Sequence, residues 1–203
     1  MRPGFSRFDP AWRALRRREV ALWAAGLFRR DAAIFDSETT GLGSRDEFVQ
    51  LGVIDLRGDV LLDALVRPSR PIPPEATAVH RLTDADVAGA PAFPALYGAL
   101  RDALGGRTVI VYNAEYDQRI LWQTCRLYGL PMIEAGRWYC AMKAYARFHG
   151  AWNSQHGDFR WHRLTAACAA EGVPVGAAHS AIDDCRLTLA LLRKMAAGAD
   201  PAP

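Results

Sequence analysis

Cysteine is scarce in this chain, and its spacing excludes the usual cysteine chemistry. The sequence has 203 residues and four cysteines, none of which form a C-x-x-C pair: Cys125, Cys140, Cys168 and Cys185. Structural zinc sites generally use closely spaced pairs, and disulfide scaffolds need a much denser set. We therefore expect reduced, mostly buried thiols, as in a cytoplasmic protein.

Long apolar runs are also missing. A membrane-spanning helix takes about 20 apolar residues in succession, and no run comes near that length. Residues 20–28 are apolar and follow three arginines, which faintly resembles a signal peptide. Arg29, Arg30 and Asp31 stand where a small-residue cleavage site should lie, so we expect a short amphipathic helix packed on the domain. No membrane partner is expected.

Neither sign of charge is in large excess. The 25 basic and 22 acidic residues leave a net charge of only +3, so no global positive field marks a nucleic-acid partner, although local basic patches remain open. Half of the chain is hydrophobic, which suits a globular protein with a full core. Without repeats or low-complexity linkers, the sequence predicts a basic helical extension (residues 1–30), one main domain (31–196) and a flexible tail (197–203).

Hydrophobic patterning predicts an α/β domain with a mixed sheet flanked by helices. Strands are expected at residues 32–36, 48–56, 60–66 and 108–112. Helices are expected at residues 10–29, 94–104, 114–128, 139–148, 163–171 and 180–195. Arg57, Gly58 and Asp59 form a hairpin turn between the second and third strands. The prolines that follow predict an extended loop: Pro68, Pro71, Pro73 and Pro74.

Two carboxylates stand at the end of the first expected strand. Asp36 and Glu38 are two residues apart, so their side chains share one face of the strand. Hard oxygen ligands at this spacing suit Mg²⁺ or Mn²⁺. Taken alone, such a pair is more often a solvated acidic turn. The next residues are Thr39, Thr40 and Gly41. Their hydroxyls and backbone amides could donate hydrogen bonds to phosphate or sugar oxygens.

Polar residues also stand at the start of two later helices. Asn113 can cap a helix whose first turn holds Asp117, where the helix dipole favours a carboxylate by under ~1 kcal/mol. That structural explanation serves both residues as well as a functional one does. His179 precedes the last helix, and Asp183 and Asp184 lie in its first turn. A histidine beside a carboxylate suits a general base, although one of the two aspartates could simply serve the helix N-terminus.

Taken in order, these motifs resemble the DEDD exonucleases of the DnaQ-like superfamily, in the DEDDh branch that has a histidine in its third motif. The three motifs are residues 35–41, 112–117 and 179–184. A secondary match covers residues 79–83, where the family commonly has histidine, glycine, an apolar residue and threonine. The resemblance runs from about residue 32 to residue 195. Each motif alone is weak, but three in order at family-like spacing form a strong signal.

The resemblance implies a ribonuclease-H-like fold, with a mixed five-stranded sheet flanked by helices on both faces. It also implies a 3′→5′ exonuclease that uses two Mg²⁺ (or Mn²⁺) ions and releases nucleoside 5′-monophosphates. In the family pattern, Asp36 would bridge both metals, while Glu38 and Asp184 would hold the metal that binds the attacking water. Asp117 would support the second metal, and His179 would act as the general base.

The resemblance further implies contacts to a nucleic acid, which we expect to be a single-stranded DNA 3′ end. The candidate substrate-binding residues are Ser37, Thr39, Thr40, Gly41, His80 and Asn113. An exoribonuclease that acts on short RNA or RNA 3′ ends remains an alternative, as does a proofreading or binding subunit of a larger complex. Either a monomer or a homodimer is compatible with the family. Three residues depart from the family pattern: Ser37, Arg81 in place of the usual glycine, and Tyr112, expected to pack in the sheet.

Residues 138–161 are dense in aromatic and basic side chains, a combination that often holds single-stranded nucleic acid. The simpler interpretation is a long loop attached to the core by its own aromatics, which would explain more than half of these residues. The basic N-terminal helix is equally open. It could steer a phosphate backbone or a partner, or it could be a solvated face.

Overall fold

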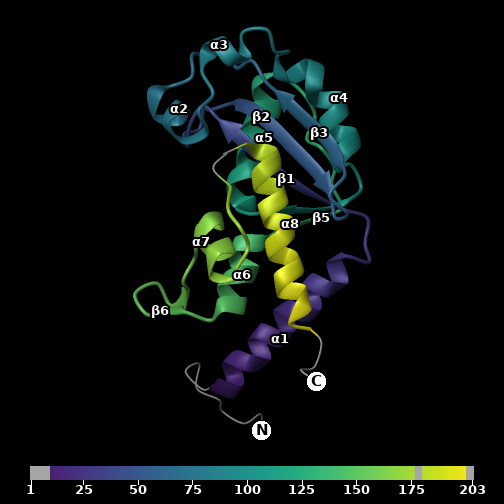
Figure 1. Cartoon of the computed structure of the whole chain (residues 1–203). Helices are drawn as coiled ribbons and strands as arrows, with labels where there is room; N and C mark the ends of the chain where they lie inside the picture. The colour runs from purple at the N-terminus through teal and green to yellow at the C-terminus, as the bar shows by residue number, and fades with distance from the viewer. Residues whose placement is uncertain (1–9, 177–179, 200–203) are drawn as a thin grey trace.

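A five-stranded mixed sheet forms the centre of the molecule (Figure 1). The computed structural model describes residues 10–176 and 180–199. The strands are β1 (Ala32–Thr39), β2 (Phe48–Asp55), β3 (Val60–Leu65), β4 (Thr108–Val111) and β5 (Arg137–Cys140). Their order across the sheet is β3-β2-β1-β4-β5, with β1–β2 and β2–β3 antiparallel and the other two pairs parallel. The predicted mixed sheet of five strands is confirmed.

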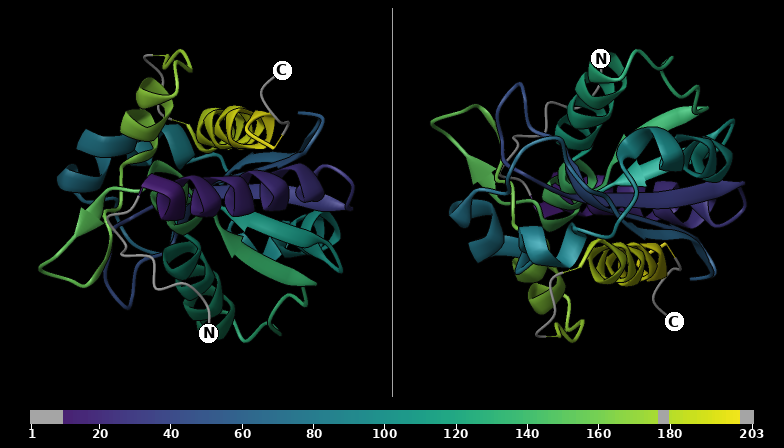
Figure 2. Two further views of the ribbon diagram at one scale, coloured as in Figure 1. Left: turned by 90° about the horizontal axis from the view of Figure 1, so that it is seen from below. Right: turned by 90° about the horizontal axis from the view of Figure 1, so that it is seen from above.

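Helices cover both faces of this sheet, as Figure 2 shows with α8 on one side and α5 on the other. The helices are α1 (Pro10–Leu27), α2 (Pro74–His80), α3 (Asp84–Val87), α4 (Phe93–Leu104), α5 (Ala114–Leu127), α6 (Ala141–His149), α7 (Leu164–Ala170) and α8 (Ala181–Ala197). Alternate residues of β1 point to opposite faces. Ile34 packs into the core beneath α1 and α8, whereas Phe35 packs into the core beneath α4 and α5. The central strand is therefore buried on both sides.

The fifth strand was not predicted from the residues. We expected a helix over residues 139–148, but β5 runs to Cys140 and α6 begins only at Ala141. The four residues of β5 are half-buried or exposed and form no apolar run, so their extended form depends on parallel pairing with β4. Such non-local pairing leaves little trace in a short segment.

The proline-rich segment is also more helical than predicted. Pro73 occupies the N-cap of α2 and Pro74 its first helical position. A backbone N–H at that position has no partner inside the helix, so a proline there costs no hydrogen bond. The prolines therefore start a helix here rather than only extending a loop. The short helix α3 follows, with Thr83 and Asp86 forming a capping box.

The basic N-terminal helix forms close to where it was predicted and packs against α8 and α6. Ala21, Ala24 and Leu27 are fully or almost fully buried in this contact. All four cysteines are free thiols, and three of them are buried, as expected. No helix in the described part of the chain is both long enough and apolar enough to cross a membrane.

Candidate active site

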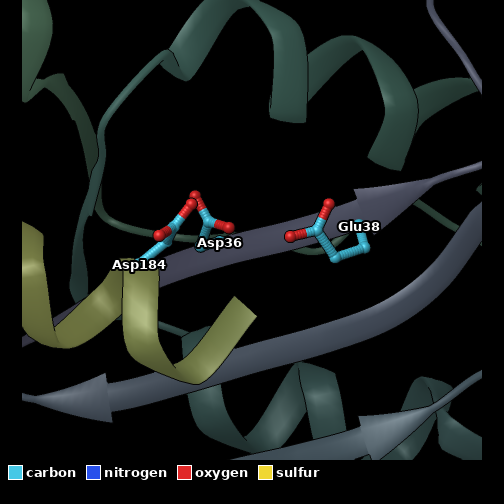
Figure 3. A group of neighbouring side chains, drawn as sticks. All are labelled: Asp36, Glu38 and Asp184. Carbon is cyan, nitrogen blue, oxygen red and sulfur yellow. The ribbon is translucent and has the colours of Figure 1, made fainter. Parts of the chain in front are cut away.

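Three carboxylates meet where β1 approaches the start of α8. Asp36, Glu38 and Asp184 each offer a carboxylate oxygen, and these oxygens lie within 4.8 Å of one another (Figure 3). All three side chains are partly buried. The period of the strand puts Asp36 and Glu38 on one face, as predicted, and α8 adds the third acid from a segment almost 150 positions later in the chain.

The N-terminus of α8 separates the roles of its two adjacent aspartates. Ser180 is the N-cap, and its hydroxyl accepts a hydrogen bond from the backbone N–H of Asp183 at 3.2 Å. The same hydroxyl donates to the Asp183 carboxylate at 2.8 Å. Asp183 therefore serves the helix end, and Asp184 is the residue that joins the cluster. The residues alone had left this choice open, and the family resemblance had named Asp184.

A glycine in β2 allows α8 to approach the sheet this closely. Gly52 lies opposite Asp36 in the β1–β2 register. A Cβ at Gly52 would lie 2.6 Å from the backbone carbonyl carbon of Ala181 and 2.8 Å from the amide nitrogen of Ile182. Since helix backbone cannot move away at small cost, only glycine fits here. The carboxylate cluster thus depends on an uncharged residue that no motif contains.

Asp117 lies beside the three carboxylates rather than among them. It is buried in the first turn of α5, and its Oδ1 accepts a hydrogen bond from the Ser37 hydroxyl at 2.7 Å. Its charge acts on both Asp36 and Glu38. Asn113 occupies the N-cap position of α5, but its side chain makes no capping hydrogen bond and is exposed, so the expected capping role is wrong.

Burial and mutual repulsion make this cluster reluctant to ionise. Burial, followed by the charges of Asp117, Asp184 and Glu38, raises the pKa of Asp36 well above its usual value. Burial and the charges of Asp184 and Asp117 raise the pKa of Glu38 to about 7. Burial also raises the pKa of Asp117 to about 7, although the hydrogen bond from Ser37 lowers this pKa in part. Crowded carboxylates of this kind are stabilised by a cation placed between them.

The threonines after Glu38 are tied into their own loop. The Thr39 hydroxyl bonds to the Tyr116 hydroxyl and donates to the carbonyl of Gly41 at 3.1 Å. The Tyr116 hydroxyl donates to the same carbonyl at 2.8 Å. The Thr40 hydroxyl donates to Asp46 at 2.8 Å. These residues therefore shape the loop beside the site. Tyr116 was missed in the sequence, although its position next to Asp117 in the second motif was a usable signal.

His80 lies against the end of β1, next to the backbone of Thr39. It is 3% exposed, and burial lowers its pKa, which favours the neutral ring. Its Nδ1 accepts a hydrogen bond from the Leu82 amide at 3.1 Å. The next residue, Arg81, has a φ of 68°, which is the left-handed conformation at the end of α2. That conformation explains why glycine is usual at this place in the family.

Two further expectations have different outcomes. His179, the expected general base, lies outside the described residues. Tyr112 is buried in the core under α6 and α8, and its hydroxyl donates to the carbonyl of His162 at 2.8 Å. Its expected role in packing is confirmed, with the addition that it holds the segment before α7.

Comparison with known proteins agrees with this geometry. A family model described as Exonuclease (RNase_T) matches residues 33–192. An uncharacterized exonuclease, CP81, of Escherichia phage 186 is 41% identical over 174 residues, which cover 83% of this chain and 89% of that protein. Exodeoxyribonuclease 10 of Escherichia coli K12 is 34% identical over 162 residues, which cover 78% of this chain and 66% of that protein.

Solved structures extend the likeness to three dimensions. Exonuclease X in complex with 5′ overhanging duplex DNA has a TM-score of 0.59 and 29% identity, covering 81% of this chain and 90% of that one. The nuclease domain of 3′hExo, a DEDDh family member bound to rAMP, has a TM-score of 0.65 at 19% identity and covers 81% and 91% of the two chains, which is a likeness of fold. The chain therefore belongs to the DnaQ-like exonucleases and has their ribonuclease-H-like fold.

Proposed function

We propose that this exonuclease acts in the 3′→5′ direction on single-stranded DNA ends and releases nucleoside 5′-monophosphates. The observation that carries the proposal is the meeting of Asp36, Glu38 and Asp184 beside the buried Asp117. The family membership supports phosphodiester hydrolysis at such a cluster. The relatives named as an exodeoxyribonuclease and as a nuclease bound to duplex DNA support DNA over RNA.

The donor set fits Mg²⁺ or Mn²⁺, because carboxylate oxygens are hard ligands and the cluster is short of positive charge. Asp36, Glu38 and Asp184 would hold one ion, and Asp36 together with Asp117 would hold a second. Two such ions, when bound, neutralise the scissile phosphate and stabilise both the attacking and the leaving oxygen. Asp36 is the ligand that both ions would share, so it is the most sensitive position.

The remaining chemistry falls to the residues of the chain. An imidazole nitrogen of His179 takes the proton from the attacking water, which a neutral histidine can do near pH 7. The water oxygen then bonds to phosphorus, and the bond from phosphorus to the 3′ oxygen of the preceding nucleotide breaks. Ser37 holds the Asp117 carboxylate in place through its hydrogen bond at 2.7 Å. The products are a 5′-monophosphate and a strand shorter by one nucleotide.

Alanine substitutions of the shared ligand and of the acid on α8 test the mechanism. We expect Asp36→Ala and Asp184→Ala to remain folded and to release no nucleotide from a labelled oligonucleotide in Mg²⁺. Asp102→Ala is the matched control, because Asp102 is an exposed acid on α4. Retained turnover in Asp36→Ala would sink the assignment. Absence of Mg²⁺-dependent turnover in the isolated wild-type chain would favour a binding subunit instead.

Matched DNA and RNA oligonucleotides test the substrate. The two differ at the terminal sugar by the 2′-hydroxyl, which is how a protein distinguishes RNA from DNA at one position. We expect deoxynucleotides to be released faster than ribonucleotides. We also expect a label on the 3′-terminal nucleotide to be released before a label inside the strand. RNA digestion at an equal or higher rate would replace the DNA assignment with the exoribonuclease alternative.

A further inference from the structure

A large groove is separate from the carboxylate site, because none of the four acids Asp36, Glu38, Asp117 and Asp184 lines it. Its walls come from α1, β5, α6 and a small hairpin made of β6 (Trp152–Asn153) and β7 (Asp158–Phe159). Its volume is about 1070 Å³. We call it the α1–hairpin groove. The helix α1 precedes the segment that the exonuclease family model matches, so this wall is an addition to the family domain.

Aromatic side chains line this groove without being sealed into a core. They are Trp12, Trp23, Trp138, Tyr139, Trp152 and Phe159. All six are half-buried, so part of each side chain is accessible to solvent. Trp12 stacks on Phe159 with ring centres 5.8 Å apart and an interplanar angle of 15°, which joins α1 to the hairpin. Trp152 packs edge-on against the same Phe159 ring at 5.4 Å, and all three side chains stay partly exposed.

The charged residues of the groove are mostly basic. Among the residues that the structure describes, Arg16, Lys143 and Arg147 line it together with one acid, Glu19. The guanidinium of Arg16 lies 5.3 Å from the centre of the Trp12 ring and forms an ion pair with Glu19 at 2.6 Å. Arg13 and Arg18 add positive charge to α1, whereas Arg17 lies over the Phe148 ring and pairs with Glu171 at 3.7 Å. Stacking rings combined with positive charge fit a flexible polyanion that carries aromatic bases.

Lys143 in the wall of the groove contacts α5, the helix that carries Asp117. Lys143 forms an ion pair with Glu115, which lies in the first turn of α5 two residues before Asp117. The Lys143 ammonium also lies 5.6 Å from the centre of the exposed Trp161 ring. Because β5, β4 and β1 are parallel, Cys140 in the groove wall is at the same edge of the sheet as the catalytic acids.

We propose that the α1–hairpin groove binds the single-stranded segment immediately 5′ of the nucleotide being removed. Bases of that segment stack on the accessible parts of the half-buried rings, and its phosphates contact the cations of α1 and α6. A base-paired duplex would hide its base faces from these rings, so the occupant is a single strand. The inference rests on the proposed function, because it takes the 3′ end to lie at Asp36.

Binding of oligonucleotides by the metal-free protein tests the groove without turnover. We use fluorescence anisotropy in EDTA with a trinucleotide and with an oligothymidylate of about 15 nucleotides, a length that exceeds typical single-strand sites. Arg147 is exposed at the end of α6, so Arg147→Glu should leave the fold intact. Arg101→Glu on α4 is the matched charge reversal away from the groove.

We expect Arg147→Glu to weaken binding of the long oligonucleotide about 5- to 10-fold, to leave the trinucleotide almost unchanged, and to lower the salt slope by about one. Trp152→Ala should weaken binding of the long oligonucleotide without changing the salt slope, since it removes an aromatic ring and no charge; circular dichroism should show that the variant, which also loses the contact with Phe159, is still folded. Arg101→Glu should change neither the affinity for the long oligonucleotide nor the salt slope. Wild-type affinity in both groove variants would overturn the proposal, as would an equal loss of affinity for a blunt duplex.

A small substrate separates the groove from the active site. The p-nitrophenyl ester of thymidine 5′-monophosphate is too short to reach the α1–hairpin groove, so its Mg²⁺-dependent hydrolysis reports on the carboxylates alone. Hydrolysis of the ester together with unaltered oligonucleotide binding in the variants would refute the groove and keep the nuclease. Weakened binding in the variants without ester hydrolysis would support the groove and refute the proposed function.

Discussion

Replacing Glu38 with glutamine should stabilise the metal-free protein at alkaline pH, although it removes one carboxylate of the proposed metal site. Glu38 is crowded by Asp184 and Asp117, and burial with these charges raises its pKa from 4.5 to about 7 in the folded chain. Between those two pH values the folded state binds more protons than the unfolded state does. The stability of the wild type therefore falls as pH rises through this window, and the penalty is complete above it.

The size of the effect follows from the same two values. Each pKa unit corresponds to about 1.4 kcal/mol, so the difference between 4.5 and about 7 sets an upper bound near ~3 kcal/mol. Glu38 keeps some contact with solvent, and screening reduces this bound to ~1–2 kcal/mol. For a chain of this length, that is a rise in Tm of roughly 2–8 °C. Glutamine keeps the shape of the side chain and carries no charge.

Thermal unfolding in EDTA measures this directly. We expect Glu38→Gln to melt above the wild type at about pH 8.5 and close to it at about pH 4.5, where Glu38 is protonated in the folded state. Millimolar Mg²⁺ should raise the Tm of the wild type more than that of the variant. Glu134→Gln, at an exposed position before β5, is the control and should show no pH-dependent difference. A variant that melts at or below the wild type at alkaline pH would refute the reasoning.

Two backbone positions give further predictions. Gly52→Ala should cost ~3 kcal/mol or more of stability and lower turnover at least ~100-fold, because its Cβ would push Ala181 and with it Asp184 away from β1. Calorimetry and nucleotide release check this against Gly89→Ala, where the added methyl meets open space; equal behaviour of the two variants would contradict it. Arg81→Gly should raise stability by ~1 kcal/mol by relieving the left-handed φ of 68°, and an unchanged denaturation midpoint would show that the arginine side chain offsets the strain.

Local patterns in the sequence predicted most of the sheet and much of the site. The apolar run before Asp36 and the two-residue period fixed the first strand and the shared face of Asp36 and Glu38. The predicted helix starts placed Asp117 and Asp184 in the first turns of their helices, which made both of them candidate site residues. These features are local, because each depends on neighbours within a few positions of the chain.

The features that the sequence did not predict depend on distant contacts. The strand β5 is extended because it pairs with β4, and its own residues carry no such pattern. The importance of Gly52 depends on the register of β2 against β1 and on where α8 lands, neither of which local preference determines. The division of labour between Asp183 and Asp184 needed the hydrogen bonds of Ser180.

The packing of α1 shows that the folding unit is longer than the segment matched by the family model. The family match begins at residue 33, yet Ala21 and Ala24 of α1 are fully buried against helices of the nuclease fold. A chain cut back to the matched residues would uncover the apolar surface that these residues and Leu27 conceal, and it would be prone to aggregate. Joining residues 33–192 to an unrelated N-terminal segment in place of α1 would expose the same apolar surface. The helix and the catalytic domain are therefore expected to be inherited as one piece.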